Sequence, residues 1–302
     1  MSDDVGQWIT PTLEVLARHA QTPGNVASPG DLAQAVERAI TAVIVDQRKT
    51  LWSGMLGKQV LYPHPSGVSF WVRLGDGISM YAVRSDKDDV ATRFILSHLT
   101  PGGTFLDVGA NTGWFALRAA ARYRELGSGS VHAFEPQKVM FDLITRSIAE
   151  NGLQDLINLH DVALGNEEKT VWMATPAFNS GGATVRFREI NESLPVSMTR
   201  LDVLKLDTGR IDIMKVDIEG SEPLFIEGAG DFIREHRPKI YSELHPTKLQ
   251  RVSNRSREDY LQQMQDLGYR VLVLSRSGGT EPLEAAHLED TRRLLDVVFD
   301  PA

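Results

Sequence analysis

The 302-residue sequence contains no cysteine. This absence excludes disulfide bonds, thiolate zinc sites and a cysteine nucleophile, and it fits a reducing compartment. The sequence also lacks any run of the roughly 20 apolar residues that a bilayer-spanning helix requires. Its first residues, MSDDVGQWIT, are acidic where a signal peptide would be basic. We therefore expect a cytoplasmic protein with no membrane partner.

The sequence also contains fewer basic than acidic residues. Lysine and arginine together number 32 against 40 acidic residues, which gives a formal net charge of −8. No run of basic residues offsets this total. Proteins that bind nucleic acid usually present a basic surface to the phosphate backbone, so the composition predicts no nucleic-acid partner. The 42% hydrophobic content is sufficient for a sizeable core.

Alternating strand-like and helix-like segments fill the chain from Phe105 onward. The strand-like segments, several of them almost wholly apolar, are TFLDVG, SVHAFEP, INLHDVAL, IDIMKVD, KIYSELH, RVLVLS and LLDVVFD. Apolar strands that alternate with amphipathic helices are typical of a sheet covered on both faces. The pattern predicts an α/β fold with a doubly wound, mostly parallel sheet.

The remaining segments suggest a division of the chain. Residues 1–85 read as an extension with two helices, at 11–21 and 31–48, and a β-hairpin at about 58–74. Residues 86–302 form the main domain. Within it, residues 167–204 interrupt the alternation with β-like pieces and a flexible NSGG, and we interpret them as an inserted hairpin that forms a lid. The two N-terminal helices are a possible homodimer surface.

A glycine-containing loop follows the first strand of the alternating region. Its residues are Gly109, Ala110, Asn111, Thr112 and Gly113, and Asp107 precedes them. Glycine allows a sharp turn and close approach of a ligand, and the next helix directs free N–H groups at the loop. The spacing differs from the G-x-G-x-x-G of pyrophosphate loops. A carboxylate at Asp107 would repel pyrophosphate but pair with the ammonium of methionine, which favours S-adenosylmethionine over a dinucleotide.

Two further strand ends carry carboxylates in the expected order. Glu135, followed by Pro136, ends the second strand and is spaced to accept hydrogen bonds from a ribose diol. Asp161 ends the third strand and is a candidate acceptor for the adenine amino group, with Val162 and Ala163 packing on the ring. The alternative for Asp161 is a solvated residue at the rim.

These motifs resemble a known family. FLDVGANTGWFAL, VHAFEP, DVALGN, IDIMKVDIEGSEPLFIEGA and PKIYSELH are similar to segments of the FkbM family of S-adenosylmethionine-dependent methyltransferases. The resemblance is close from about 88 to 245 and does not cover the first eighty or so residues. It implies a seven-stranded sheet whose last strand is antiparallel, and methyl transfer, usually to a hydroxyl of a natural product or sugar.

Four ionisable residues at the ends of the fourth and fifth strands are candidates for the chemistry. Lys215 and Asp217 share one face of a strand, and so do Glu243 and His245, because residues two apart point the same way. His245 is the preferred general base, since its ordinary pKa is near neutrality. Asp217 is the second choice and is also a candidate cofactor-binding residue. A structural histidine, an ion pair between Lys215 and Asp217, and a Mg²⁺ ion held by oxygen ligands remain alternatives.

The sequence therefore predicts an S-adenosylmethionine-dependent O-methyltransferase with a small-molecule hydroxyl acceptor. Three alternatives are left open. The first is a catalytically silent adenosyl-binding or oligomerisation module, and the second is a methyltransferase that acts on nitrogen or on a macromolecule. The third, a nicotinamide-dependent dehydrogenase, is disfavoured by the spacing of the loop glycines.

Overall fold

The computed structural model describes residues 56–84, 89–176, 179–189, 193–290 and 294–302. The two predicted helices at 11–21 and 31–48, with the dimer surface assigned to them, lie outside these ranges. Contacts divide the chain into a unit that ends at Lys58 and a compact unit from Gln59 to Ala302. The description below concerns the second unit.

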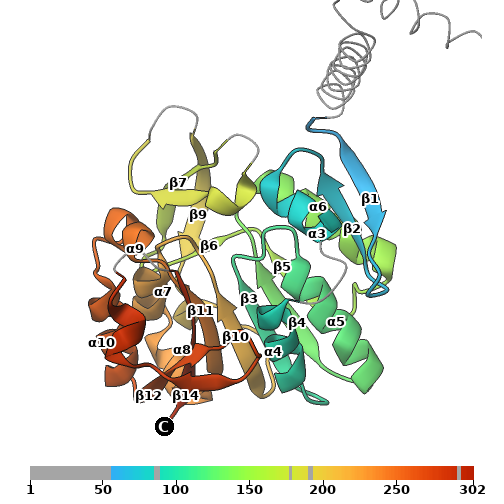
Figure 1. The fold of residues 1–302 in the computed structure, drawn as a ribbon. Coiled ribbons are helices and arrows are strands. Elements are labelled where there is room, and N and C mark those ends of the chain that lie inside the picture. Colours follow the sequence, from blue (N-terminus) through green and yellow to red (C-terminus); the bar gives the residue numbers. More distant parts are fainter. Residues whose placement is uncertain (1–55, 85–88, 177–178, 190–192, 291–293) are drawn as a thin grey trace, which may run out of the picture. The chain divides into compact units, whose positions relative to one another are not determined.

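A large, mostly parallel sheet forms the centre of this unit (Figure 1). Its strand order is β13-β12-β14-β11-β10-β3-β4-β5. The bounds are β3 Thr104–Val108, β4 Ser130–Phe134, β5 Ile157–His160, β10 Ile211–Val216, β11 Lys239–Leu244, β12 Tyr269–Leu274, β13 Thr280–Pro282 and β14 Leu295–Pro301. The final strand, β14, is antiparallel to both of its neighbours. The seven expected strands and the antiparallel last strand are confirmed, and the short edge strand β13 is an addition.

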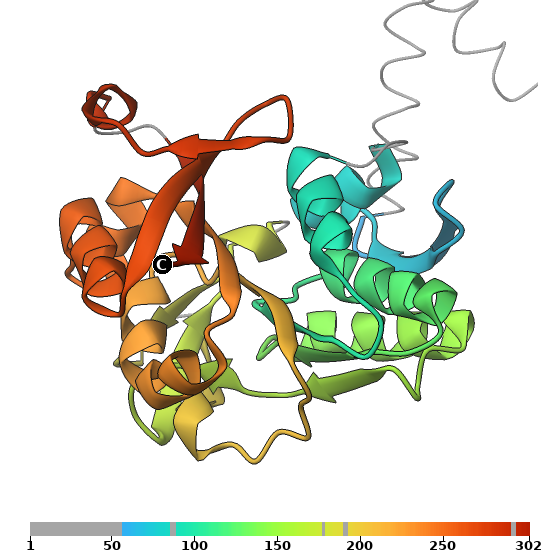
Figure 2. The ribbon, with the colours of Figure 1, turned by 90° about the horizontal axis from the view of Figure 1, so that it is seen from below.

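Helices cover both faces of the sheet. Their bounds are α4 Val90–His98, α5 Trp114–Leu126, α6 Lys138–Asn151, α7 Glu222–Gly228, α8 Gly230–His236, α9 Pro246–Val252 and α10 Arg257–Asp266. Successive residues of β3 belong to different cores, because strand side chains alternate between faces. Phe105 joins the core beneath α4, α5 and α6, and Leu106 joins the core beneath α7, α8 and α10. Figure 2 shows helices on both sides of the sheet.

The hairpin ahead of the sheet packs on helix α6. Its strands are β1 (Gln59–Pro63) and β2 (Ser69–Arg73), and helix α3 (Gly77–Arg84) follows. The amide of Ser69 donates to Asn151 Oδ1 (2.8 Å), and the amide of Trp71 donates to Ser147 Oγ (2.8 Å). Phe70 is buried and stacks on Trp114 with 5.4 Å between ring centroids. The hairpin was predicted, whereas α3 was not, and the compact unit that contains both begins at Gln59.

A second, smaller sheet is built mainly from the predicted insert. Its order is β6-β9-β7-β8, with bounds β6 Ala163–Leu164, β7 Lys169–Ala174, β8 Thr184–Arg186 and β9 Ser193–Thr199. A 3₁₀ turn, η1 (Ser180–Gly182), precedes β8. In Figure 1 this sheet lies beyond the carboxyl ends of the central strands, and η1 contacts α3. Among the described residues, no helix is both long enough and apolar enough to cross a membrane.

Candidate active site

A cavity of about 580 Å³ lies at the carboxyl ends of β3, β4, β10 and β11. The small sheet and helix α3 contribute to its walls, through residues such as Met173, Val185 and Ile78. Ligands of open α/β sheets bind at this edge, and the volume lies within the range of small-molecule sites. The fold therefore places the cavity where the sequence predicts the cofactor.

The glycine loop forms one wall of the cavity. Gly109 has a φ of 84°, and a Cβ on it would lie 2.1 Å from the carbonyl oxygen of Asp217, so no side chain fits there. Asn111 also has a positive φ, of 51°. Gly113 differs from the other predicted loop residues because its α-carbon faces Leu117 and Ile144 and it does not line the cavity. Gly109, Ala110, Asn111 and Thr112 do line it.

Glu135 lies at the end of β4 and is buried. One of its oxygens accepts a hydrogen bond from the Asn111 amide (2.7 Å), and the other accepts one from the Gln137 amide (2.8 Å). A carboxylate oxygen has two lone pairs, so each oxygen can still accept a bond from a ligand. Glu135 and Pro136 both line the cavity. This geometry fits the predicted contact of Glu135 with a ribose diol.

Asp107 has a different environment from the one the sequence suggested. The carboxylate is 0% exposed and does not line the cavity. One oxygen lies 3.2 Å from Lys215 Nζ, and the other accepts from the Ala116 amide (3.1 Å). The reason is register, because Asp107 and Lys215 are directly paired on β3 and β10. The expected direct contact of Asp107 with the methionine ammonium is therefore corrected to a buried ion pair behind the cavity wall.

Lys215 connects this ion pair to the glycine loop. It donates a hydrogen bond to the carbonyl oxygen of Gly109 (2.7 Å), and its Nζ lies 4.0 Å from Asp217 Oδ2. Burial opposes its charge, but the carboxylates of Asp107 and Asp217 outweigh burial and raise the pKa of Lys215. The ammonium therefore stays charged, as an ion-pair role requires.

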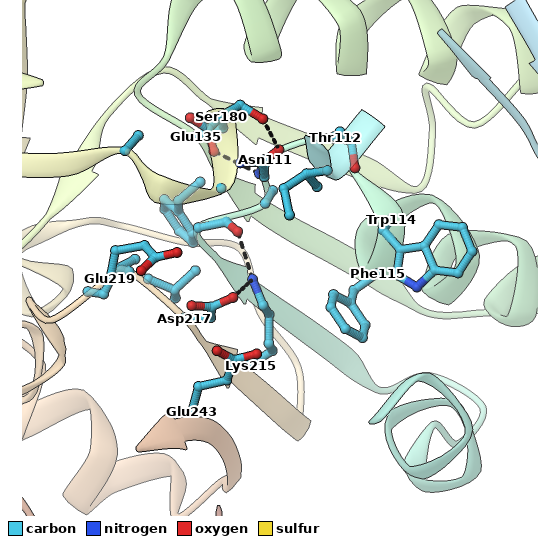
Figure 3. A pocket seen from close by; sticks show the side chains of 18 of the residues that line it. Asn111, Thr112, Trp114, Phe115, Glu135, Ser180, Lys215, Asp217, Glu219 and Glu243 are labelled. Atoms are coloured by element: carbon cyan, nitrogen blue, oxygen red, sulfur yellow. Dashed lines mark hydrogen bonds and ion pairs between the residues drawn. The ribbon is translucent and has the colours of Figure 1, made fainter. Parts of the chain in front are cut away.

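Three carboxylates gather beside Lys215 on the cavity wall. They are Asp217, Glu243 and Asp296, and Glu243 stands opposite Asp296 in the β11–β14 register. The charge of Asp217, together with burial, raises the pKa of Glu243 to about 8. The hydroxyl of Tyr241 donates to Asp296 (2.6 Å). Figure 3 shows Lys215, Asp217 and Glu243 as one group, separate from Glu135, Asn111 and Ser180.

Two further predicted site residues, in addition to Asp107 and Gly113, do not line the cavity. His245 follows the last residue of β11 and is the N-cap of α9, with φ −106° and ψ 94°. The alternation that carries Tyr241 and Glu243 to the wall ends with the strand, so the predicted convergence of His245 with Glu243 is corrected. Asp161 is exposed and does not line the cavity, which matches the rim alternative. Its neighbours Val162 and Ala163 do line it.

A family model matches the part of the chain that carries the glycine loop, Glu135, Lys215, Asp217 and Glu243. The model, described as the methyltransferase FkbM domain, covers residues 107–271. The chain belongs to the FkbM methyltransferase family. It is accordingly a methyltransferase whose cofactor is S-adenosylmethionine. No curated protein matches the chain.

Several solved structures are similar to this FkbM methyltransferase. The methyltransferase FkbM from Methylobacillus flagellatus KT is 14% identical, with a TM-score of 0.42, and the match covers 98% of this chain and 61% of that one. A TehB-like SAM-dependent methyltransferase from Corynebacterium glutamicum is 12% identical (TM-score 0.44; 74% and 93% covered). A Pyrococcus abyssi tRNA (uracil-54, C5)-methyltransferase in complex with S-adenosyl-L-homocysteine is 14% identical (0.39; 80% and 43%).

The residues of this FkbM methyltransferase fit S-adenosylmethionine. Within the described part of the chain, the hydroxyls of Thr112 and Ser221 are buried without a hydrogen-bond partner, and both residues line the cavity. Glu135 offers the carboxylate, and the glycine at 109 leaves the backbone open to close approach. These groups would hold the sugar and amino-acid ends of the cofactor. In the described residues, no group of three or more His, Cys, Asp or Glu is placed to hold a metal ion.

Glu222 of this FkbM methyltransferase shapes the site, although no role was predicted for it. The buried carboxylate accepts hydrogen bonds from the amides of Ile218 (3.0 Å) and Gly220 (2.9 Å). Gly220 has a φ of 101°, and a Cβ on it would lie 2.4 Å from the carbonyl oxygen of Lys248. The signal was present in DIEGSE, where a second acid follows the glycine. Cavity-lining Asp89, Tyr241 and Asp296 were also missed as polar site residues, whereas Ser180 belongs to the NSGG segment of the expected lid.

The free energy of unfolding of this FkbM methyltransferase is expected to increase as the pH falls from about 8.5 to 6.5. The folded-state pKa values of Glu135 and Glu222 are raised by burial to about 7, and that of Glu243 to about 8, from an ordinary 4.5. Carboxyls with raised pKa values take up protons more readily when folded, so their stabilisation is lost as pH rises through 7 to 8. Burial lowers the pKa values of His132 and His160, so these two histidines lower the free energy of unfolding as the pH falls below about 6.5.

Denaturant unfolding of the cofactor-free protein at several pH values checks this expectation. The free energy of unfolding should rise by about 3 kcal/mol in total over this window, because proton uptake by each of the three carboxyls contributes on the order of 1 kcal/mol. Glu243→Gln should remove the part of the change nearest pH 8. A free energy that is flat, or that falls as the pH is lowered, would show that these carboxyls are already ionised in the folded state.

Proposed function

We propose that this protein transfers the methyl group of S-adenosylmethionine to a hydroxyl of a small molecule, such as a natural product or a sugar. The observation that carries the proposal is the charge of the cavity wall. Its lining includes six carboxyl side chains, of which Glu135 and Glu243 ionise only near pH 7 to 8, and one basic side chain, Lys215. The carboxylates are those of Asp89, Glu135, Asp217, Glu219, Glu243 and Asp296. Such a wall would repel the phosphates of a nucleic acid but accepts the hydroxyls of a neutral or cationic molecule.

The carboxylates of Asp217 and Glu243 suit the removal of a hydroxyl proton. When bound, S-adenosylmethionine supplies an electrophilic methyl group. The hydroxyl must lose its proton as its oxygen forms the new bond, and a positioned base contributes about 10²–10⁴-fold to such a step. The pKa of Glu243, raised to about 8 chiefly by Asp217, makes its carboxylate a stronger base than an ordinary glutamate. Glu243 takes the proton, and Lys215 fixes Asp217 beside it.

The alternatives predict different acceptors or none. A macromolecular acceptor would need to pass the small sheet and α3, which both contribute residues to the cavity wall. A silent adenosyl-binding module would have no use for a base at Glu243. Placement in natural-product biosynthesis and a cytoplasmic location remain parts of the proposal that rest on the sequence.

The test is a screen with methyl-labelled S-adenosylmethionine. The purified protein is incubated with a panel of hydroxylated small molecules that includes sugars and macrolides, and in parallel with matched amines and with total tRNA. We expect label to appear as an alkali-stable methyl ether on a hydroxylated compound and not on tRNA. Label on tRNA, or on the amine of a compound whose hydroxyls stay unlabelled, would overturn the proposal.

A further inference from the structure

A buried aspartate outside the matched family region joins three segments of the fold. Asp76 follows β2 and precedes α3, and it is 1% exposed. Its carboxylate accepts hydrogen bonds from the Ser79 amide (3.0 Å), the Ser180 amide (2.6 Å) and the Ser180 hydroxyl (2.8 Å). Asp76 and Ser180 are 104 positions apart in sequence. The contact therefore fastens turn η1 of the insert to the beginning of α3.

Ser180 extends this contact to the glycine loop. Its Oγ lies 2.8 Å from Asp76 Oδ2 and 3.0 Å from Asn111 Oδ1, so one hydroxyl group bridges the two side chains. Asn111 in turn donates its backbone amide to Glu135 (2.7 Å). Figure 3 shows Ser180, Asn111 and Glu135 together at one end of the cavity. A continuous chain of hydrogen bonds thus leads from Asp76 to the carboxylate that faces the ribose site.

The packing around the turn makes this chain sensitive to small displacements. A Cβ on Gly181 would lie 2.4 Å from Ile78 Cγ1, so η1 and α3 approach as closely as a glycine allows. Asn111 has a positive φ of 51°, which is an uncommon conformation for a residue with a side chain. Its side-chain and backbone hydrogen bonds hold this conformation. Release of Ser180 would free both η1 and Asn111.

We propose that Asp76 is a positioning residue that sets how tightly and for how long S-adenosylmethionine is held. The hydrogen-bonded group of Asp76, Ser180, Asn111 and Glu135, here named the clasp, fixes η1 over the ribose end of the cavity. The clasp must open for η1 to move away from Glu135, so cofactor release is coupled to it. The inference rests on S-adenosylmethionine occupying this cavity, which is part of the proposed function, and is independent of the acceptor's identity.

Asp76→Asn and Ser180→Ala test the clasp. In Asp76→Asn an amide nitrogen replaces one of the two carboxylate oxygens, both of which accept hydrogen bonds. This nitrogen carries two hydrogens and cannot accept a bond, so it faces a backbone N–H or hydroxyl donor without forming one. Ser180→Ala removes the bridging hydroxyl and leaves the amide of residue 180 to bond Asp76. Asp231→Asn, on the surface of α8, and Ser253→Ala, at the end of α9, are matched controls that do not line the cavity.

Three measurements distinguish a clasp from general structural support. They are the Kd for S-adenosylmethionine by calorimetry, its release rate by stopped flow, and hydrogen exchange of the cofactor-free protein. Both clasp variants should raise Kd about tenfold, mainly through faster release, as expected for loss of a hydrogen bond to a charged group. Exchange should accelerate at the amides of residues 180 and 111 and stay unchanged in β3 and β10. The two controls should match the unmodified protein.

Other outcomes would overturn the inference. Exchange that accelerates evenly through the central sheet would make Asp76 a general stability residue. Faster hydrogen exchange only at residues 180 and 111, with an unchanged Kd and release rate, would mean that the clasp does not affect cofactor binding. Glu135→Ala serves as the reference for the site itself, and an unchanged Kd in that variant would mean that the ribose lies elsewhere and that the clasp does not hold it. Methyl transfer to tRNA or to an amine instead of a hydroxyl, by contrast, would refute the proposed reaction without altering any of these three readouts.

Discussion

Lys215→Met is expected to lower the free energy of unfolding by about 3–5 kcal/mol, the usual cost of leaving one member of a buried ion pair without its partner. The lysine is 3% exposed and lies 3.2 Å from Asp107, which is wholly buried. Methionine fills a similar volume but supplies no charge. Asp107 must then stay ionised without a cation or take up a proton, and burial already raises its pKa. Denaturant unfolding at neutral pH measures the loss.

Lys138→Met provides a matched control for this stability loss. Lys138 forms an ion pair with Asp142 on the surface of α6, where both side chains are largely exposed. Exposed pairs contribute about 0–1 kcal/mol, so this variant should unfold almost as the unmodified protein does. The double variant Lys215→Met with Asp107→Asn should recover part of the loss, because no buried charge remains. If Lys215→Met is no more destabilising than Lys138→Met, the buried pair does not support the fold as described.

Glu243→Gln should reduce turnover by about 10²–10⁴-fold, once an acceptor is known, because the amide cannot take the hydroxyl proton. The substitution preserves shape, and Glu243 lies at the acidic end of the cavity rather than with the clasp, so the Kd for S-adenosylmethionine should change little. In the unmodified protein, kcat/KM should rise with pH, reach half its maximum near pH 8, where the Glu243 carboxyl is half ionised, and level off about one pH unit higher. The variant should lose this dependence.

His245→Ala decides between the two candidate bases. The histidine is the base preferred from the sequence, whereas the geometry places Glu243, and not His245, on the cavity wall. Glu243 as base predicts that His245→Ala keeps turnover within a few-fold of the unmodified protein. The reverse result, a large loss of turnover in His245→Ala and a small one in Glu243→Gln, would make His245 the general base.

The central sheet was predictable because its strands are nearly continuous apolar runs that only a doubly covered sheet can bury. Glu135 was predictable for the same reason, since a carboxylate directly after a buried strand lies at the ligand edge. Helix α3 was not, because its segment, GISMYAVR, opens with glycine and lacks an acidic first turn. Strand β13 is short and wholly exposed, so it carries no hydrophobic signal.

Pairing between strands explains one corrected site residue, Asp107, and one missed site residue, Asp296. Asp107 looks available in the sequence, but the register of β3 with β10 puts Lys215 directly beside it. Asp296 belongs to the site because antiparallel pairing brings it opposite Glu243. Neither fact follows from the spacing of residues within one segment. The contact of Asp76 with Ser180 is harder still to foresee, because it joins a hairpin to an insert.

The position of β14 constrains how the molecule is assembled. Residues 295–301 occupy the slot between β11 and β12, and β12 bonds only to β14 and β13 among the strands of this sheet that the structure describes. During synthesis on the ribosome, β12 and β13 can pair with each other as a hairpin. They cannot join the central sheet until β14, which lies between β12 and β11 in the sheet, has left the exit tunnel. The carboxylate of Asp296 arrives in the same event, so the acidic wall is completed only after β10 and β11, which precede β14 in the chain, have already been made.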